Sequence, residues 1–204
     1  MTHKSTALRT AVAVLTVAAT LAVGSPSALA DSPRVTTCLR PDGTSVQEFA
    51  GLSVSVVLPF YPGCDKIKSS ATWTTGFGWY AAKTWEGIPA GYVPVGSAPI
   101  QDFVSHLVSA RILVDAGTPA EFSVVWPNSR ALLLYSDAQY DYASGITLGT
   151  VRPLSVGRHT LQRFITLSGV TCDGTSSDPD LSCAPGGELA YDDPSDPLVF
   201  SVVR

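Results

Sequence analysis

The stretch ATWTTGFGWY, residues 71–80, predicts a β-strand. Threonine and aromatic residues fit the pleated surface of a sheet, and residues two apart lie on the same face of a strand. Trp73, Phe77 and Trp79 therefore share a face. An aromatic trio on one face is more often core than binding platform, because aromatic burial dominates core energetics. We expect this face to lie in the hydrophobic core.

Further short runs of β-branched and aromatic residues flank this stretch, separated by turn-forming residues. The runs cover residues 35–39, 44–49, 52–58, 110–115, 122–126, 131–135, 146–151, 159–167 and 198–203. The residues Arg40-Pro41-Asp42-Gly43 suit a type I turn and predict a hairpin between the first two runs. The pattern is typical of an all-β sandwich or barrel. The chain is 45% apolar and 15% charged over 204 residues, which excludes intrinsic disorder.

Residues 97–108 depart from the strand pattern. Their apolar positions 100, 103, 104, 107 and 108 follow helical spacing. Ser97 is a suitable N-cap, and Pro99 fits the first helical turn. The sequence therefore predicts one short helix over about residues 98–108, which closes one end or edge of the sandwich.

Residues 1–30 predict a cleaved signal peptide. The start is weakly basic, the apolar stretch 11–23 is too short to span a bilayer, and Ala28-Leu29-Ala30 fits a cleavage site. Residues 31–204 then form a single domain with 11 basic and 17 acidic residues, because Lys4 and Arg9 leave with the signal. This acidic balance argues against nucleic-acid binding. No later apolar run is long enough for a membrane span, so we predict a secreted, extracellular protein. A retained N-terminal anchor is the alternative.

The four cysteines all follow the predicted signal, so an oxidising compartment and two disulfides are expected. Of the three possible connectivities we favour the sequence-local one, Cys38–Cys64 and Cys172–Cys183. A metal site is the weaker alternative, because the sequence has no Cys-x-x-Cys pair and its remaining histidines are remote from the cysteines.

Residues 154–167 contain Leu154, Gly157 and His159 in an L-x-x-G-x-H spacing that leads from a turn into a strand. This run resembles the corresponding part of immunoglobulin-like and fibronectin-III-like sandwiches. Residues 75–80 and 112–117 resemble uncharacterised secreted bacterial, in particular actinobacterial, proteins of that build. The resemblance covers residues 73–175. It implies an immunoglobulin-like β-sandwich and carries no catalytic residue.

Aromatic residues outside the predicted core are the candidate ligand-binding residues: Trp85, Tyr92, Tyr140 and Tyr142. Exposed Trp and Tyr rings on a β-sandwich can stack on the faces of sugar rings. We therefore predict a secreted, non-catalytic binding or structural module of the cell envelope or extracellular space. A cell-wall glycan is the first candidate ligand, and an envelope protein the second. The same residues could instead be packed inside the protein.

The segment between Cys172 and Cys183 is a candidate metal site. Its carboxylates, Asp173, Asp178 and Asp180, are the oxygen ligands that calcium prefers. Their spacing does not match a helix–loop–helix calcium loop, and Asp is also a common turn residue. A solvated loop is therefore the favoured interpretation, with a calcium-stabilised adhesion module as an alternative. No other cofactor is predicted.

Catalytic motifs are scarce. The sequence has no Gly-x-Ser-x-Gly elbow, and two histidines, His106 and His159, could act as a base outside the predicted signal. Each histidine is more simply explained as a structural residue with hydrogen-bonded ring nitrogens. The sequence thus favours a protein that is not an enzyme. A secreted hydrolase that uses His159 or His106 with a nearby carboxylate is the alternative.

Overall fold

Strands dominate the structure, a computed structural model that describes residues 38–40, 42–128, 132–136 and 142–204. Of residues 132–136 and 142–148 only the backbone is described. The chain divides into two units, Met1–Pro33 and Arg34–Arg204, and every described residue belongs to the second. The predicted signal peptide, residues 1–30, lies outside the described residues.

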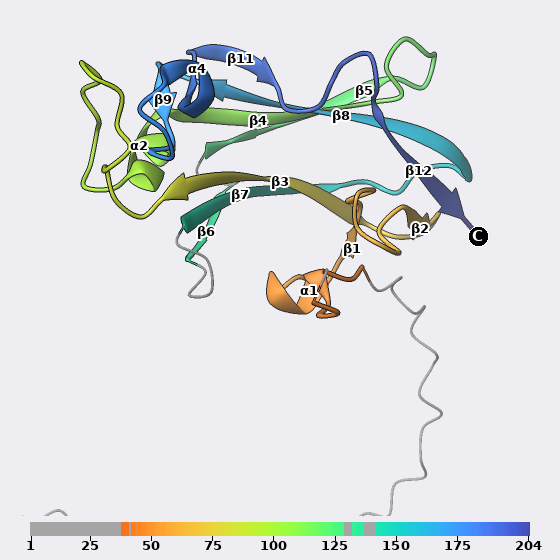
Figure 1. Ribbon diagram of the computed structural model, residues 1–204. Coiled ribbons are helices and arrows are strands. Elements are labelled where there is room, and N and C mark those ends of the chain that lie inside the picture. The colour runs from red at the N-terminus through yellow and green to blue at the C-terminus, as the bar shows by residue number, and fades with distance from the viewer. Residues whose placement is uncertain (1–37, 41, 129–131, 137–141) are drawn as a thin grey trace, which may run out of the picture. The chain divides into compact units, whose positions relative to one another are not determined.

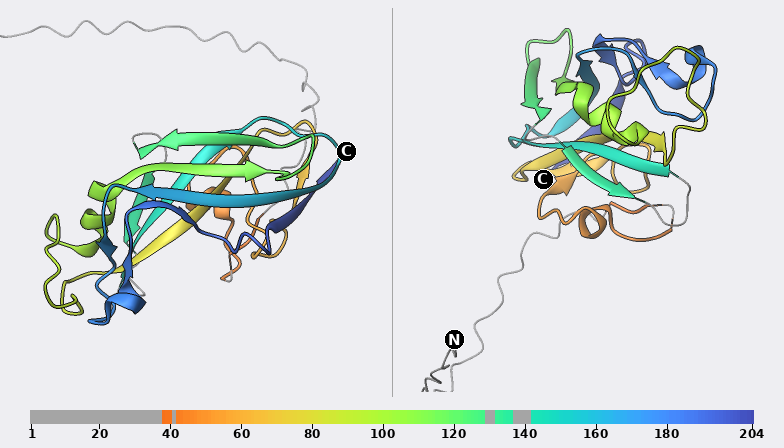
Figure 2. Two further views of the ribbon diagram at one scale, coloured as in Figure 1. Left: turned by 90° about the horizontal axis from the view of Figure 1, so that it is seen from above. Right: turned by 90° about the vertical axis from the view of Figure 1, so that its left-hand side faces the viewer.

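Two sheets pack face to face (Figures 1 and 2). One has the order β1 (Ser55–Val56), β3 (Trp73–Ala82), β7 (Tyr142–Val151), β6 (Leu132–Ser136). The other has the order β2 (Lys66–Lys68), β12 (Leu198–Val203), β8 (Gly157–Leu167), β4 (Leu107–Val114), β5 (Phe122–Pro127), and β11 (Gly187–Ala190) also pairs with β8. The edge pairs β1–β3 and β2–β12 are parallel, whereas the long central pairs β3–β7 and β4–β8 are antiparallel. The all-β prediction is confirmed.

The aromatic face of β3 lies in the core between the sheets, as expected. Trp73 is fully buried, its ring contacts Phe200 of the opposite sheet at a centroid distance of 5.3 Å, and its Nε1 donates to the Arg152 carbonyl. Further along the strand, Phe77 is buried, and Trp79 stacks on Phe103 with ring centroids 4.8 Å apart. The core therefore continues from the two sheets onto helix α2 (Pro99–His106).

A buried arginine joins the two sheets. Arg163 of β8 is almost fully buried, and its Nη1 donates to the Gly76 carbonyl of β3 in the opposite sheet. The rest of its guanidinium forms a two-point pair with Asp192, in which Nε and Nη2 lie 2.9 and 2.6 Å from the two carboxylate oxygens. Asp192 belongs to the segment between β11 and β12, where the chain leaves the sheet. One side chain thus connects both sheets and a loop.

The predicted turn at residues 40–43 is present, because the Gly43 amide donates to the Arg40 carbonyl at 2.9 Å. The strand predicted over 44–49 is wrong, since residues Val46–Phe49 form helix α1. The Ser45 hydroxyl caps this helix by accepting from the Glu48 amide. Ser and Glu three residues apart form a helix-start signature that outweighs the local strand propensity.

Helix α2 ends earlier than predicted. It covers Pro99–His106, and residues 107 and 108 instead begin β4. Pro99 occupies the first turn as expected, but the N-cap is Ala98 and not Ser97. The Ser97 amide and hydroxyl donate to the Gln101 side chain instead. The prediction of a single helix is also corrected, because the described residues include α1 and α4 (Pro179–Ser182) besides α2.

Candidate binding site at the α2 end

Four parts of the chain meet at one end of the two sheets (Figures 1 and 2). They are α2, the segment 83–98 that precedes it, α4, and a small antiparallel pair formed by β9 (Thr171–Cys172) and β10 (Cys183–Ala184). We call residues 83–98 the strap, and this whole region the α2 end. The Ala82 amide, just before the strap, donates to the Asp173 carbonyl at 2.8 Å. A Cβ at Gly87 would overlap the Gly174 carbonyl, so the strap lies directly against the loop after β9.

Two of the predicted ligand-binding residues lie together in the strap. Trp85 and Tyr92 are both partly exposed, with ring centroids 6.3 Å apart and planes tilted by 49°. The Tyr92 hydroxyl lies 2.5 Å from Asp102 Oδ2 and 3.1 Å from the Val170 carbonyl oxygen. Burial, the hydrogen bond to Asp102 and the charge of Asp102 raise the pKa of Tyr92 above its ordinary value. Tyr92 is therefore a fixed, neutral aromatic group.

The other two predicted ligand-binding residues follow the strand β6. Tyr140 lies outside the described residues. Tyr142 is the first residue of β7, where its backbone pairs with Ala82, the last residue of β3, just before the strap. The backbone of Tyr142 is thus placed at the α2 end, and its side chain is not described.

Asp102 fixes the strap to α2, and the sequence reasoning missed it. Its side chain is fully buried, although an acidic residue in the first turn of a helix is ordinarily exposed. One oxygen accepts from the Val95 amide at 2.7 Å, and the other accepts from Tyr92. His106 Nδ1 lies 3.6 Å from the second oxygen. Helical periodicity places Asp102 off the apolar stripe and gives no sign that an irregular segment covers it.

We expect Asp102→Ala to loosen the strap. The Val95 amide and the Tyr92 hydroxyl lose a charged acceptor, and such hydrogen bonds contribute about 1.5–3 kcal/mol each. Hydrogen exchange at the Val95 amide should therefore accelerate by roughly tenfold or more, since 1.4 kcal/mol corresponds to a factor of ten. Ser97→Ala is the control, because the Gln101 contact that it removes is exposed. Unchanged exchange at Val95 in Asp102→Ala would contradict this role.

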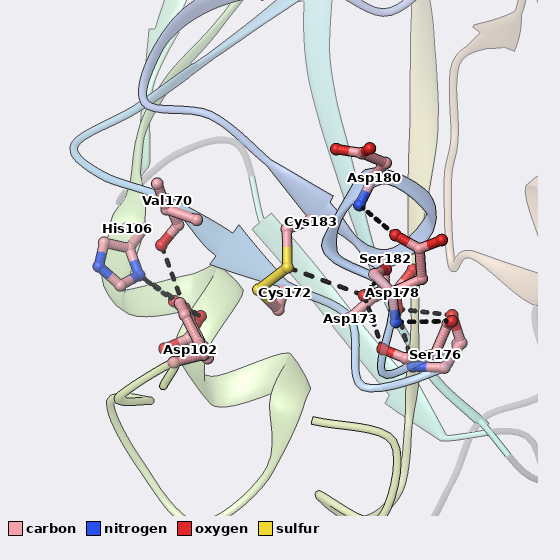
Figure 3. Close-up of a disulfide and its surroundings, with 12 residues drawn as sticks. Asp102, His106, Val170, Cys172, Asp173, Ser176, Asp178, Asp180, Ser182 and Cys183 are labelled. Carbon is pink, nitrogen blue, oxygen red and sulfur yellow. Dashed lines mark hydrogen bonds and ion pairs between the residues drawn. A yellow bond between two sulfur atoms is a disulfide. The ribbon is translucent and has the colours of Figure 1, made fainter. Parts of the chain in front are cut away.

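The disulfides have the predicted sequence-local pairing, Cys38–Cys64 and Cys172–Cys183. Cys172 and Cys183 are directly opposite each other in β9 and β10. Figure 3 shows this disulfide between α2, which carries Asp102 and His106, and the loop 173–182. The bridge therefore closes the loop against which the strap lies.

Two of the three predicted metal ligands, Asp173 and Asp178, accept hydrogen bonds within their own loop, whereas Asp180 is exposed (Figure 3). Asp173 accepts from the amide and hydroxyl of Thr175, and Asp178 caps α4 by accepting from the Asp180 amide. Within the described ranges, no group of three or more His, Cys, Asp or Glu residues is arranged to hold a metal ion. The calcium prediction gains no support from this arrangement.

Both candidate catalytic histidines pair with a carboxylate. His159 is buried, with Nδ1 2.7 Å from Asp115 Oδ2 and Nε2 2.9 Å from the Ser155 carbonyl oxygen. Both of its ring nitrogens are thus engaged, which suits a structural role. His106 Nδ1 lies 3.0 Å from the backbone carbonyl of Asp102 and is largely directed at this oxygen.

Comparison with known proteins identifies no family. No family model matches the chain, and no curated protein or solved structure matches it. Across the residues that the structure describes, no helix is long and apolar enough to cross a membrane. The function proposed below therefore rests on the residues of the α2 end.

Proposed function

We propose that this protein is an exported, non-catalytic binding module with an immunoglobulin-like two-sheet architecture. Its ligand binds at the α2 end, where Trp85 and Tyr92 supply the contact surface. The first candidate ligand is a glycan of the cell envelope. The predicted signal peptide and the two disulfides support export, because disulfides persist in oxidising compartments. The facing sheets and their long antiparallel central pairs support the architecture.

The Trp85–Tyr92 pair carries this proposal. Both residues are partly exposed, and Tyr92 is anchored through its hydroxyl to Asp102 and Val170. An aromatic surface that is held in place before binding loses little conformational entropy when a ligand arrives. Ring faces pack against the apolar faces of sugars, while neighbouring carbonyl and hydroxyl groups can pair with sugar hydroxyls. The pair therefore suits a neutral polyhydroxylated ligand.

A protein partner is the second candidate, because large apolar side chains are exposed on the same elements. Val93 of the strap is 83% exposed, and Leu181 of α4 is 75% exposed. Burial of exposed apolar side chains is a main driving force of protein–protein association. Replacement of Val93 by Ser distinguishes the two candidates, since it removes an apolar contact and leaves both aromatic rings.

The test is retention of residues 31–204 on purified peptidoglycan, chitin and cellulose. We expect the wild type to be retained on at least one of these polymers. The double variant Trp85→Leu, Tyr92→Leu should lose retention at least tenfold, because it keeps apolar bulk and removes both flat rings. Phe60→Ala is the matched control, since Phe60 is an aromatic residue that is 54% exposed outside the α2 end. Circular dichroism establishes that each variant is folded.

The outcomes separate the parts of the proposal. Retention of the wild type and the double variant alike would keep the binding function and reject the site. No retention of the wild type on any polymer would reject the glycan ligand.

A further inference from the structure

His106 presents one ring nitrogen to the interior and the other to solvent. Its Nδ1 lies 3.0 Å from the backbone carbonyl oxygen of Asp102, on the preceding turn of α2. Nε2 has no hydrogen-bond partner among the described residues, and it is not one of the buried atoms that lack a partner, which there belong to Trp79, Trp85 and Thr171. Water therefore reaches Nε2, in agreement with a side chain that is 19% exposed. Figure 3 shows the ring with one nitrogen directed at Asp102 and the other pointing away.

The surroundings of Nδ1 fix the position of the ring proton. A carbonyl oxygen only accepts hydrogen bonds, so Nδ1 must carry a proton to donate to it. The Ser105 hydroxyl lies 3.4 Å from Nδ1, but it donates its own hydrogen to the same Asp102 carbonyl at 2.8 Å. A neutral imidazole has one N–H, so a proton on Nδ1 leaves Nε2 with a free lone pair. Nε2 of neutral His106 is therefore an acceptor directed at solvent.

His106 is a direct neighbour of the proposed contact residue Tyr92. The Tyr92 hydroxyl lies 2.5 Å and His106 Nδ1 3.6 Å from the same oxygen, Oδ2 of the buried Asp102. Two consecutive residues also contact both side chains. The carbonyl oxygen of Val170 is 3.1 Å from the Tyr92 hydroxyl, and a Cβ at Gly169 would lie 3.4 Å from His106 Nε2. Because Gly169 has no side chain, this edge of the His106 ring stays uncovered.

We propose that His106 is a second ligand-binding residue of the α2 end, and that its Nε2 accepts a hydrogen bond from a hydroxyl or amide N–H group of the ligand. This inference rests on the proposed function and deepens it, because it specifies what the ligand must offer beside Tyr92. An unsubstituted sugar hydroxyl or an acetamido N–H meets this requirement, whereas ether, ester and anionic groups have no hydrogen to donate. The buried carboxylate of Asp102 adds to the selection, because it repels a negative charge placed next to it.

The position of the ring proton can be tested without a ligand. Residues 31–204 contain two histidines, His106 and His159, so two-bond 1H–15N NMR correlations of the rings give two patterns. At about pH 8, where imidazoles are ordinarily neutral, we expect His106 in the Nδ1–H form. The variant His106→Asn identifies its signals by their loss. A His106 ring with its proton on Nε2 would overturn the inference, because no acceptor would then face the ligand.

The binding role is tested with two variants of His106 on the polymer that retains the wild type. In His106→Asn the amide nitrogen can take the place of Nδ1 and donate to the Asp102 carbonyl, but no atom replaces Nε2. In His106→Gln the longer side chain brings an amide group to the position of Nε2. We expect His106→Asn to lower retention about fivefold, the usual effect of one hydrogen bond, at an unchanged melting temperature. His106→Gln should be retained more strongly than His106→Asn.

The outcomes keep this inference apart from the proposed function. Undiminished retention of His106→Asn overturns the inference while the proposed function stands. Equal losses in the two variants, or a loss that accompanies a lower melting temperature, would show a structural role of the ring and overturn the inference as well. If the wild type is retained on no polymer, the glycan function fails, and the contact assigned to His106 fails with it.

Discussion

Replacement of Arg163 by Met is expected to lower the free energy of unfolding by about 3–5 kcal/mol, the usual loss when one partner of a buried ion pair is removed. The side chains of Arg163 and Asp192 are only 2% and 9% exposed. Methionine preserves the apolar stem, but it leaves the Asp192 carboxylate buried without its counter-charge. It also removes the donor to Gly76, and with it the polar link between the sheets. Urea unfolding followed by tryptophan fluorescence measures the effect.

Arg111→Met is the control for this prediction. Arg111 forms the same two-point pair with Glu188, with Nε and Nη2 at 2.9 and 2.6 Å from the carboxylate oxygens. The Glu188 side chain is 47% exposed, so water screens the pair, and its loss should cost about 1 kcal/mol or less. Equal losses for the two variants would contradict the role assigned to burial. The double variant Arg163→Met, Asp192→Leu should recover part of the stability, because no unpaired charge remains.

Removal of the Cys38–Cys64 disulfide is expected to be the next most damaging change. The double variant Cys38→Ala, Cys64→Ala opens a loop with a sequence separation of 26. The chain-entropy relation assigns such a loop about 3.5 kcal/mol, through the freedom that the unfolded chain regains. Both cysteines are also fully buried in a small apolar cluster with Val46, Val56 and Leu58. The variant therefore loses packing in addition to the cross-link.

The second disulfide gives the comparison. Cys172→Ala, Cys183→Ala opens a loop with a separation of 11, for which the same relation gives about 2.8 kcal/mol. Equilibrium unfolding in urea should rank the Cys38–Cys64 variant as the less stable of the two. The reverse ranking would mean that the Cys172–Cys183 bridge stabilises the folded α2 end directly. Its contribution to the free energy of unfolding would then not come mainly from restricting the unfolded chain.

Long periodic runs could be predicted from the sequence, and short or irregular ones could not. The run 198–203 coincides with β12, and 159–167 lies within β8, because each alternates buried and less buried residues over a full strand. Strands β2, β9 and β10 have two or three residues each, too few to show a period. Val108 shows how a periodic pattern can extend an element too far. It fits the apolar stripe of the predicted helix, yet it lies in β4 and is 49% exposed.

The candidate site was predicted in part. Trp85 and Tyr92 stood out as aromatic residues in a Gly- and Pro-rich segment, and the structure places them side by side. Their connection to Asp102 could not be predicted, because it depends on the path of the strap and not on a local pattern.

The parallel pairing of β2 with β12 has a consequence for the order of folding. Lys66 is the partner of Ser201, more than a hundred residues later, so this edge of the six-stranded sheet cannot form before residues 198–203 are available. Contacts between such distant residues form slowly, because closing so long a loop costs chain entropy before the contact stabilises it. The Cys38–Cys64 loop, by contrast, can close early. The six-stranded sheet is therefore completed only when its last strand pairs, and a chain that lacks residues 198–203 leaves β2 without its partner strand.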